Sequence, residues 1–286
     1  ISQHPKSSLI PDALLEVGEI YYNQQNFTTA LEKFEKIDSY PQSKAYPYGL
    51  YKSAWCLYNL KQTDAGVQKL LSVVKNNPAD STDQKKYNLR KEALRDLTLF
   101  VGESVPPQEL FSFFQRITTE NELGEVIINL AGLYESHSRY KEISIFVKEF
   151  IDKYPQNLHA AKSYSKLIET NETLKDRDTV INYMKKMGEF CRTEINPECK
   201  TEFRKVSLEI SKKWWDIWLK NKKHTEFSKL TEQAFEILLS QEDVSLPDSV
   251  SRYAYAELLF QQEKYESAGA NYEEVSQNKK LDKTKQ

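Results

Sequence analysis

Histidines are the first residues to ask about chemistry, because imidazole serves as a general base and as a metal ligand near neutral pH. The four histidines stand far apart, and none has cysteine or acidic companions at metal-ligand spacing; they are His4, His137, His159 and His224. The sequence also lacks a His-Glu-x-x-His motif, a paired Cys-x-x-Cys motif and a glycine-rich phosphate loop. A structural or solvent-facing role accounts better for each histidine than catalysis. We therefore predict no enzyme active site, no metal site and no cofactor.

The three cysteines suggest one covalent link. Cys191 and Cys199 flank the segment RTEINPE, which reads as the connection between two helices with Pro197 opening the second. A connection of this kind can bring two α-carbons within the roughly 5.5 Å that a disulfide needs. The bridge requires an oxidising compartment, and the alternative is two unrelated thiols in a reducing one. Cys56 stands in mid-helix and is expected to be a buried small hydrophobe.

Aromatic residues offer binding chemistry in the segment YPYGLYKSAWCLYN, residues 46–59. Leu50, Ala54 and Leu57 follow helical spacing and are expected to face the core. The other stripe of that helix carries aromatic and amide side chains, namely Tyr48, Tyr51, Trp55, Tyr58 and Asn59. Tyrosine and tryptophan are frequent at binding hot spots because they combine a large rigid area with a polar tip.

A repeat positions these side chains. Pro5, Ser7 and Pro11 recur as Pro41, Ser43 and Pro47, at a constant offset of 36 residues. A fixed period in the thirties is typical of stacked helical hairpins, each too small to bury its own apolar face. Within a unit, small residues such as Gly18 and Ala30 would let two helix backbones approach closely.

The pattern resembles the tetratricopeptide repeat, which has a small residue, an aromatic three positions on, a small residue twelve positions on and a terminal proline. The unit after Pro11 fits it well; the next carries Leu57 in the aromatic position, and a later one has Ile143 where alanine is usual. The resemblance implies an all-α solenoid of about seven to eight hairpins. We expect one continuous domain over 1–286, divided as follows: 1–10 the end of a preceding repeat, 11–80 two well-formed repeats, 81–123 a degenerate hairpin, 124–157 a repeat, 158–246 degenerate hairpins, 247–278 a repeat and 279–286 a tail. The start at Ile1 suggests an excerpt of a longer chain.

The resemblance also implies where a partner would bind. In tetratricopeptide solenoids the first helix of each hairpin lines the concave groove. The aromatic stripe would then face that groove, with Glu19, Tyr22 and Asn23 beside it from the first unit. The alternative is that some of these residues pack against the neighbouring helix. A carboxylate clamp is not expected, because the asparagines Asn23 and Asn59 are accompanied by Glu19 rather than by a lysine.

Charge and hydropathy exclude two other classes of partner. The chain has 40 basic and 42 acidic residues, which argues against a general electrostatic grip on nucleic acid. A local basic cluster at Lys212–Lys213 and Lys220–Lys223 adjoins the segment WWDIW, but Trp214 and Trp218 lie four apart on one helical face and are expected in the core. Runs of about eighteen apolar residues, which would span a membrane, are absent.

Several phrases, among them AYPYGLYKSAWCLYNL, resemble the long tetratricopeptide proteins of predatory and gliding Gram-negative bacteria and the periplasmic coordinators of outer-membrane assembly. This resemblance implies a periplasmic or outer-membrane-associated location; a cytoplasmic one is the alternative. The leading hypothesis is a non-catalytic scaffold that binds a protein or peptide in its groove. The alternative is the helical arm of a peptidoglycan-acting envelope enzyme whose catalytic domain lies outside this chain. Homo-oligomerisation through exposed repeat ends is a third hypothesis.

Overall fold

The computed structural model describes residues 7–102, 104–193, 197–241 and 249–277, and in these ranges it contains fourteen α-helices and one short 3-10 helix. The predicted all-α fold of helical hairpins is confirmed. Contacts divide the chain into two compact units, Ile1–Asn157 and Leu158–Gln286, each of which is described by itself. The continuous solenoid over 1–286 stays a prediction. Residues 1–6 of the segment predicted at 1–10, and the whole tail predicted at 279–286, lie outside the described residues.

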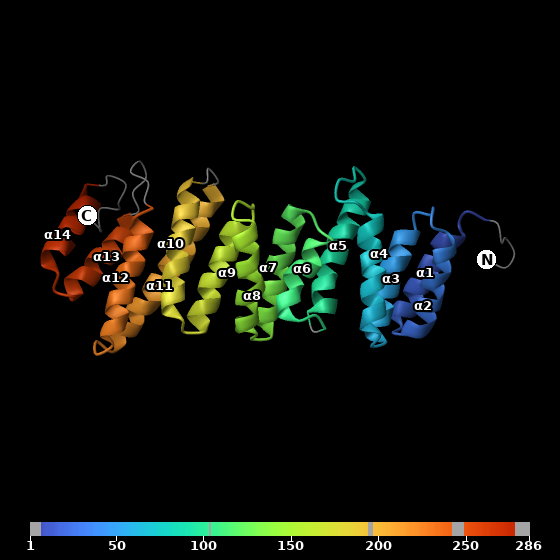
Figure 1. Ribbon diagram of the computed structural model, residues 1–286, viewed down its shortest axis with the longest axis horizontal. Helices are drawn as coiled ribbons and strands as arrows, with labels where there is room; N and C mark the ends of the chain where they lie inside the picture. Colours follow the sequence, from blue (N-terminus) through green and yellow to red (C-terminus); the bar gives the residue numbers. More distant parts are fainter. Residues whose placement is uncertain (1–6, 103, 194–196, 242–248, 278–286) are drawn as a thin grey trace. The chain divides into compact units, whose positions relative to one another are not determined.

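Unit 1 is a stack of helices in chain order (Figure 1). Its elements are α1 (Ile10–Asn23), α2 (Phe27–Glu35), η1 (Lys36–Ser39), α3 (Tyr46–Asn59), α4 (Thr63–Asn76), α5 (Gln84–Val101), α6 (Pro107–Gln115), α7 (Glu120–Ser136) and α8 (Tyr140–Lys153). Helices α1 and α2, α3 and α4, and α7 and α8 form antiparallel pairs, and α2 packs on α3 as α4 packs on α5. The predicted hairpin at 81–123 is open, because α5 packs mainly on α4 and α7 whereas α6 packs mainly on α8.

Unit 2 contains three further pairs. They comprise α9 (Ala160–Thr173), α10 (Arg177–Thr193), α11 (Pro197–Lys220), α12 (Thr225–Leu239), α13 (Ser249–Gln261) and α14 (Tyr265–Ser276). The expectation that Trp214 and Trp218 belong to the core is confirmed, since they are 0% and 5% exposed. The Trp214 indole donates to Glu172 of α9 at 2.9 Å, and Lys213 forms an ion pair with the same carboxylate at 3.0 Å.

Five hairpins share one kind of turn between their helices. A single residue in each turn has φ between 57° and 63°, and none is glycine; these are Gln25, Lys61, Ser138, Lys175 and Glu263. The N–H of that residue bonds to the carbonyl three positions earlier, and the next N–H bonds to the carbonyl five positions before itself, as in Gln25 to Tyr22 and Asn26 to Tyr21. These two hydrogen bonds satisfy backbone carbonyls that would otherwise lack donors at the end of the helix.

Close helix approach depends on the small residues that the repeat pattern predicts. A Cβ at Gly18 would lie 2.3 Å from the nearest ring carbon of Phe34, a side chain with no solvent exposure. A Cβ at Gly66 would lie 3.0 Å from the carbonyl oxygen of Ala54. Ala30 and Ala54 are themselves fully buried. The prediction that larger residues would hold the two helices apart is confirmed at Gly18 and Gly66.

One buried ion pair connects four segments of unit 1. Arg90 of α5 forms a two-pronged salt bridge with Glu122 of α7, through Nε–Oε1 at 2.6 Å and Nη2–Oε2 at 3.0 Å. Its remaining donors reach the carbonyl oxygens of Val74, Asn77 and Ile117. Burial alone would raise the pKa of Glu122, but hydrogen bonds from Arg90 and Thr119 lower the pKa below its usual value. One guanidinium group thus connects four segments: the end of α4, the body of α5, the segment before α7 and α7 itself.

Helix α5 begins inside a polar segment. Residues 77–88 are mostly polar, which is typical of a connection between helices, yet residues from Gln84 onward are helical. Asp83 explains the difference, because its side chain caps the helix by accepting from the N–H of Lys85 at 3.0 Å. Helix α7 likewise begins at Glu120, before the predicted boundary at 124, with a capping box between Thr119 and Glu122.

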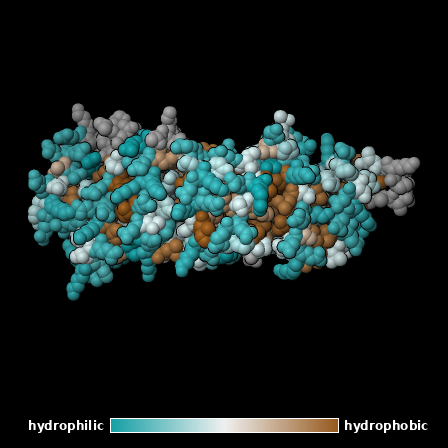
Figure 2. Space-filling view, in the orientation of Figure 1, coloured by the Kyte–Doolittle hydropathy of each residue, from teal (hydrophilic) through white to brown (hydrophobic). Residues whose placement is uncertain are grey.

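Hydrophilic residues dominate the face seen in Figure 2, and apolar residues show between them as separate patches. No helix in the described ranges is both long enough and apolar enough to cross a membrane.

The substitution Gly18→Ala should destabilise unit 1 by about 1–2 kcal/mol. Overpacking a filled core typically destabilises a protein by about 1–3 kcal/mol, and the higher helix propensity of alanine offsets only part of that loss. Gly132→Ala is the matched control, because Gly132 is also helical and nothing lies within 4 Å of its added Cβ. That variant should be stabilised by about 0.5–1 kcal/mol. Urea unfolding of both variants measures their free energies of unfolding. Equal changes in the two variants would show that the Phe34 ring moves aside without loss of stability.

Candidate functional site

Helix α3 has two faces of different character. The predicted core residues Leu50, Ala54 and Leu57 are buried, which confirms that part of the helical pattern. The opposite stripe carries side chains that are half-buried, namely Tyr48, Tyr51, Trp55 and Tyr58. We call these four residues the α3 stripe. Their partial exposure leaves aromatic surface in contact with solvent.

Asp96 of α5 holds the middle of the α3 stripe in place. Its Oδ2 accepts a hydrogen bond from the Tyr51 hydroxyl at 2.6 Å and from the Trp55 indole N–H at 2.9 Å. Asp96 is only 8% exposed, so both donors are strongly bound to a carboxylate in a mostly dry environment. Burial, and then the hydrogen bond to Asp96, raises the pKa of Tyr51 well above its usual value. Tyr51 is therefore a neutral donor at any physiological pH.

Phe100 of α5 packs against the two residues of the α3 stripe that lie toward the C-terminal end of α3, Trp55 and Tyr58. Trp55 meets it edge to face with ring centroids 5.4 Å apart, and Tyr58 stacks on it at 4.5 Å. Phe100 is itself buried against solvent. Aromatic pairs of this geometry contribute about 0.5–1.5 kcal/mol beyond their buried area. The α3 stripe thus belongs to the α3–α5 interface while one side of it stays accessible.

Helix α1 contributes the residues that the sequence placed beside the stripe. Glu19 forms an ion pair with Lys52 of α3 at 2.8 Å, and the Lys52 ammonium lies 5.5 Å from the centre of the Tyr22 ring. Asn23 and Asn59 are exposed, and the Asn59 amide donates to the carbonyl of Trp55 in its own helix at 2.8 Å. The carboxylate of Glu19 is therefore already paired with a cation of this chain.

The structure brings the predicted residues together but adds partners that the sequence did not reveal. Glu19, Tyr22, Tyr51, Trp55 and Tyr58 each contact a side chain of a neighbouring helix, so the alternative interpretation as interhelical packing applies to them in part. The assignment of the site to a partner stays a prediction. Sequence reasoning missed Asp96, for which the signal was an aspartate inside the apolar run ALRDLTLF. It also missed Phe100 and Lys52.

Reactive groups in the described ranges are few. No cluster of three or more histidine, cysteine or acidic side chains there could hold a metal ion. Cys56 is fully buried, and this burial raises the pKa of its thiol to about 12. A thiol that stays protonated at neutral pH is a poor nucleophile.

Cys191 and Cys199 are joined by a disulfide in the structure, with α-carbons 5.3 Å apart. Both residues are buried, and the bridge links the last turn of α10 to the first turn of α11. Whether the protein forms the bridge in its own compartment stays a prediction.

Comparison with known proteins identifies the repeat. The family described as the tetratricopeptide repeat matches residues 12–43 and 48–80, which are the hairpins α1–α2 and α3–α4. These matches support the conclusion that the chain contains tetratricopeptide repeats. No curated protein matches the chain in sequence.

Solved structures with similar folds are only distantly similar. A tetratricopeptide repeat protein from Parabacteroides merdae is 10% identical, with 97% of this chain and 96% of that one covered and a TM-score of 0.38. A monomeric IFIT1 mutant solved with Gppp-AAAA is 12% identical, with 93% and 59% covered and a TM-score of 0.31. The P58(IPK) TPR domain is 12% identical, with 96% and 95% covered and a TM-score of 0.26. Likeness at this level says nothing about what the chain binds.

The substitution Asp96→Ala should destabilise unit 1 by about 2–3 kcal/mol, because it leaves the Tyr51 hydroxyl and the Trp55 indole without their shared acceptor. Tyr51→Phe should cost less, since it removes one donor and leaves the bond from Trp55. The control is Glu92→Ala, an exposed acidic residue on the same helix, which should stay within about 0.5 kcal/mol of wild type. Chemical denaturation measures all three, and an Asp96→Ala protein as stable as the control would contradict the role of Asp96.

Proposed function

We propose that this protein is a non-catalytic scaffold that binds an extended segment of a protein partner along the α3 stripe. The observation that carries the proposal is the row of half-buried aromatic side chains in which Asp96 fixes the polar tips of Tyr51 and Trp55, and Phe100 supports the rings of Trp55 and Tyr58. Side chains already held in one conformation lose little entropy when a partner docks, which favours affinity. The tetratricopeptide repeats at 12–43 and 48–80 support a protein-interaction role for this segment.

The proposal includes a location in the bacterial cell envelope. The Cys191–Cys199 disulfide supports it, because such bridges persist in oxidising compartments such as the periplasm and are rare in the cytosol. The sequence resemblance to exported repeat proteins points the same way. Self-association also belongs to the proposal, since large apolar side chains are exposed on the last hairpin, among them Phe260 at 54% and Tyr265 at 59%. Light scattering at increasing concentration would detect it, and a monomer throughout would exclude it.

Tyr48 gives the cleanest test of the binding site. Within the described residues it takes no part in the bonds to Asp96 or in the stack on Phe100, so its truncation leaves the α3–α5 interface intact. Wild-type protein on a support would first capture partners from an extract of the source organism, identified by mass spectrometry. Tyr48→Ala should then weaken binding to the purified partner by about tenfold or more, which corresponds to about 1.4 kcal/mol. Its stability should stay close to wild type.

Two comparisons separate binding from folding. Trp55→Ala should lose both affinity and stability, because Trp55 serves the partner surface and the α3–α5 interface at once. Tyr265→Ala, an exposed tyrosine of unit 2, should change neither by much. If wild type captures no protein, the proposed function is wrong. If it captures one that Tyr48→Ala binds equally well, the α3 stripe is not the site.

The compartment has its own test. Protein recovered from the envelope fraction of the source organism and digested without reductant should yield a linked peptide pair containing Cys191 and Cys199. Free alkylation of both thiols in that material would remove the support that the disulfide gives to an envelope location. Alkylation of Cys56 under native conditions serves as the control, and it should be slow because the thiol is fully buried and protonated.

A further inference from the structure

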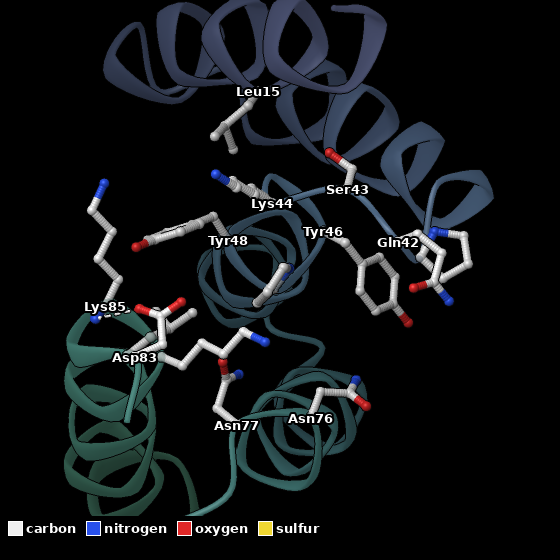
Figure 3. Close-up of a pocket in the computed structure, with 14 residues that line it drawn as sticks. Leu15, Gln42, Ser43, Lys44, Tyr46, Tyr48, Asn76, Asn77, Asp83 and Lys85 are labelled. Atoms are coloured by element: carbon white, nitrogen blue, oxygen red, sulfur yellow. Dashed lines mark hydrogen bonds between the residues drawn. The ribbon is translucent and has the colours of Figure 1, made fainter. Parts of the chain in front are cut away.

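A pocket of about 620 Å³ opens at the N-terminal end of the α3 stripe (Figure 3). Its walls come from α1, from the segment before α3, from the first turn of α3, from the end of α4 and from the start of α5. The residues used below are Leu15, Lys44, Tyr46, Tyr48, Asn77, Asp83, Lys85 and Lys86. The volume lies within the range of about 300–1,000 Å³ that is usual for ligand sites. Tyr48 belongs both to the α3 stripe and to the pocket, so the two surfaces are continuous.

The pocket is basic in a chain whose net charge is −2. Lys44 comes from the segment before α3, and Lys85 and Lys86 come from the first turn of α5; all three are exposed. None of them forms an ion pair with a described residue. Asp83 is the single acidic residue of the lining, and its carboxylate is engaged by the N–H of Lys85 as the cap of α5. Three ammonium groups and one carboxylate leave the lining with an excess of positive charge, which favours an anionic ligand.

Helix α5 adds to this field. It is 18 residues long and begins at the pocket, where the partial positive charge of a helix N-terminus lies. The lysines therefore reinforce a field that the backbone already supplies.

Asn77 contributes an unpaired hydrogen-bond acceptor to the lining. Its side chain is 0% exposed, and its amide nitrogen donates to the carbonyl of Val73 at 2.7 Å, which fixes the orientation of the carboxamide. Its Oδ1 is buried and accepts no hydrogen bond from any described residue. Figure 3 shows this carboxamide turned toward the hollow. A buried acceptor without a partner is destabilising, and a ligand N–H would supply the missing hydrogen bond.

We propose that this pocket binds an acidic stretch of a partner protein, with carboxylates near Lys44, Lys85 and Lys86 and an N–H of the ligand directed at Asn77. The inference rests on the proposed function and names the chemistry of the partner segment. A peptide fits because it carries backbone N–H donors, several carboxylates and apolar side chains together, whereas phosphate and citrate have no apolar side chains for the apolar part of the lining. The side chains of Leu15, Tyr46 and Tyr48 offer apolar contact to the residues between the acids.

The experiment is a titration with two synthetic hexapeptides, followed by fluorescence anisotropy at low and high salt. The acidic probe is fluorescein-labelled Glu-Leu-Glu-Glu-Leu-Glu, and its neutral counterpart has glutamine in place of every glutamate. We expect the acidic peptide to bind at least about tenfold more tightly, with affinity that falls as salt rises. Amide chemical-shift mapping should place the changes at Tyr48, Asn77 and the first turn of α5.

The decisive variant is Lys85→Glu/Lys86→Glu. It reverses the charge of the pocket while placing acids in the first turn of a helix, where they are compatible with the helix dipole, so the fold should survive. Affinity for the acidic peptide should fall by about tenfold or more. The matched control is Lys220→Glu/Lys223→Glu in unit 2, which makes the same charge change at exposed lysines and should leave affinity unchanged.

The outcomes are distinct. Equal binding of the neutral peptide, shifts that map elsewhere, or an equal loss in the control variant would each overturn the inference. Binding of citrate as tight as that of the acidic peptide, with competition between them, would make this a small-anion site and overturn the peptide assignment. Absence of binding would also overturn it. These titrations require no natural partner, so they can fail while the capture experiment with Tyr48→Ala succeeds, and the reverse.

Discussion

The arrangement of unit 1 depends on the buried ion pair between Arg90 and Glu122. Removing one partner from such a pair commonly costs about 3–5 kcal/mol, because the remaining charge stays in a dry environment. Here the guanidinium also satisfies three backbone carbonyls, so the pair fixes the position of α5 between α4 and α7. Helix α5 contributes to both surfaces described above: Asp96 and Phe100 support the α3 stripe, and Lys85 and Lys86 line the pocket. The ion pair reaches the pocket directly, because Arg90 donates to the carbonyl of Asn77, and it reaches the α3 stripe only through α5.

The α3 stripe shows how side chains that stabilise the contact between two helices can stay accessible on one side. In Trp55 the indole N–H and one ring edge serve the contact with α5, while the rest of the ring remains available to solvent. A free surface tryptophan would lose rotamer freedom on binding, whereas one already held by Asp96 and Phe100 loses little. The consequence is that sequence change at this position is constrained twice, once by the fold and once by any partner.

Sequence reasoning succeeded where the information was periodic. The 36-residue offset located the first two hairpins, and helical spacing identified the buried face of α3 and the close approach at Gly18. It failed where the contact partners have no regular separation. Asp96 binds residues 45 and 41 positions away, and Arg90 reaches Glu122 across 32, so no single period relates them. The repeat period also does not predict the pocket. Its lining comes from helix ends and connections, and their geometry depends on caps such as Asp83.

The shared turn at Gln25, Lys61, Ser138, Lys175 and Glu263 has a consequence for how such chains diverge. A non-glycine residue in the left-handed region is strained, and here the strain is accepted five times because two local backbone bonds fix the turn. Backbone amides and carbonyls make those hydrogen bonds, so many different side chains are compatible with the turn. The α9–α10 hairpin has the same turn at Lys175 although it lies outside the residues that match the repeat family. The geometry of the joint between two helices is therefore retained where the residues of the turn differ, so a hairpin can keep its shape with little constraint on the side chains at its tip.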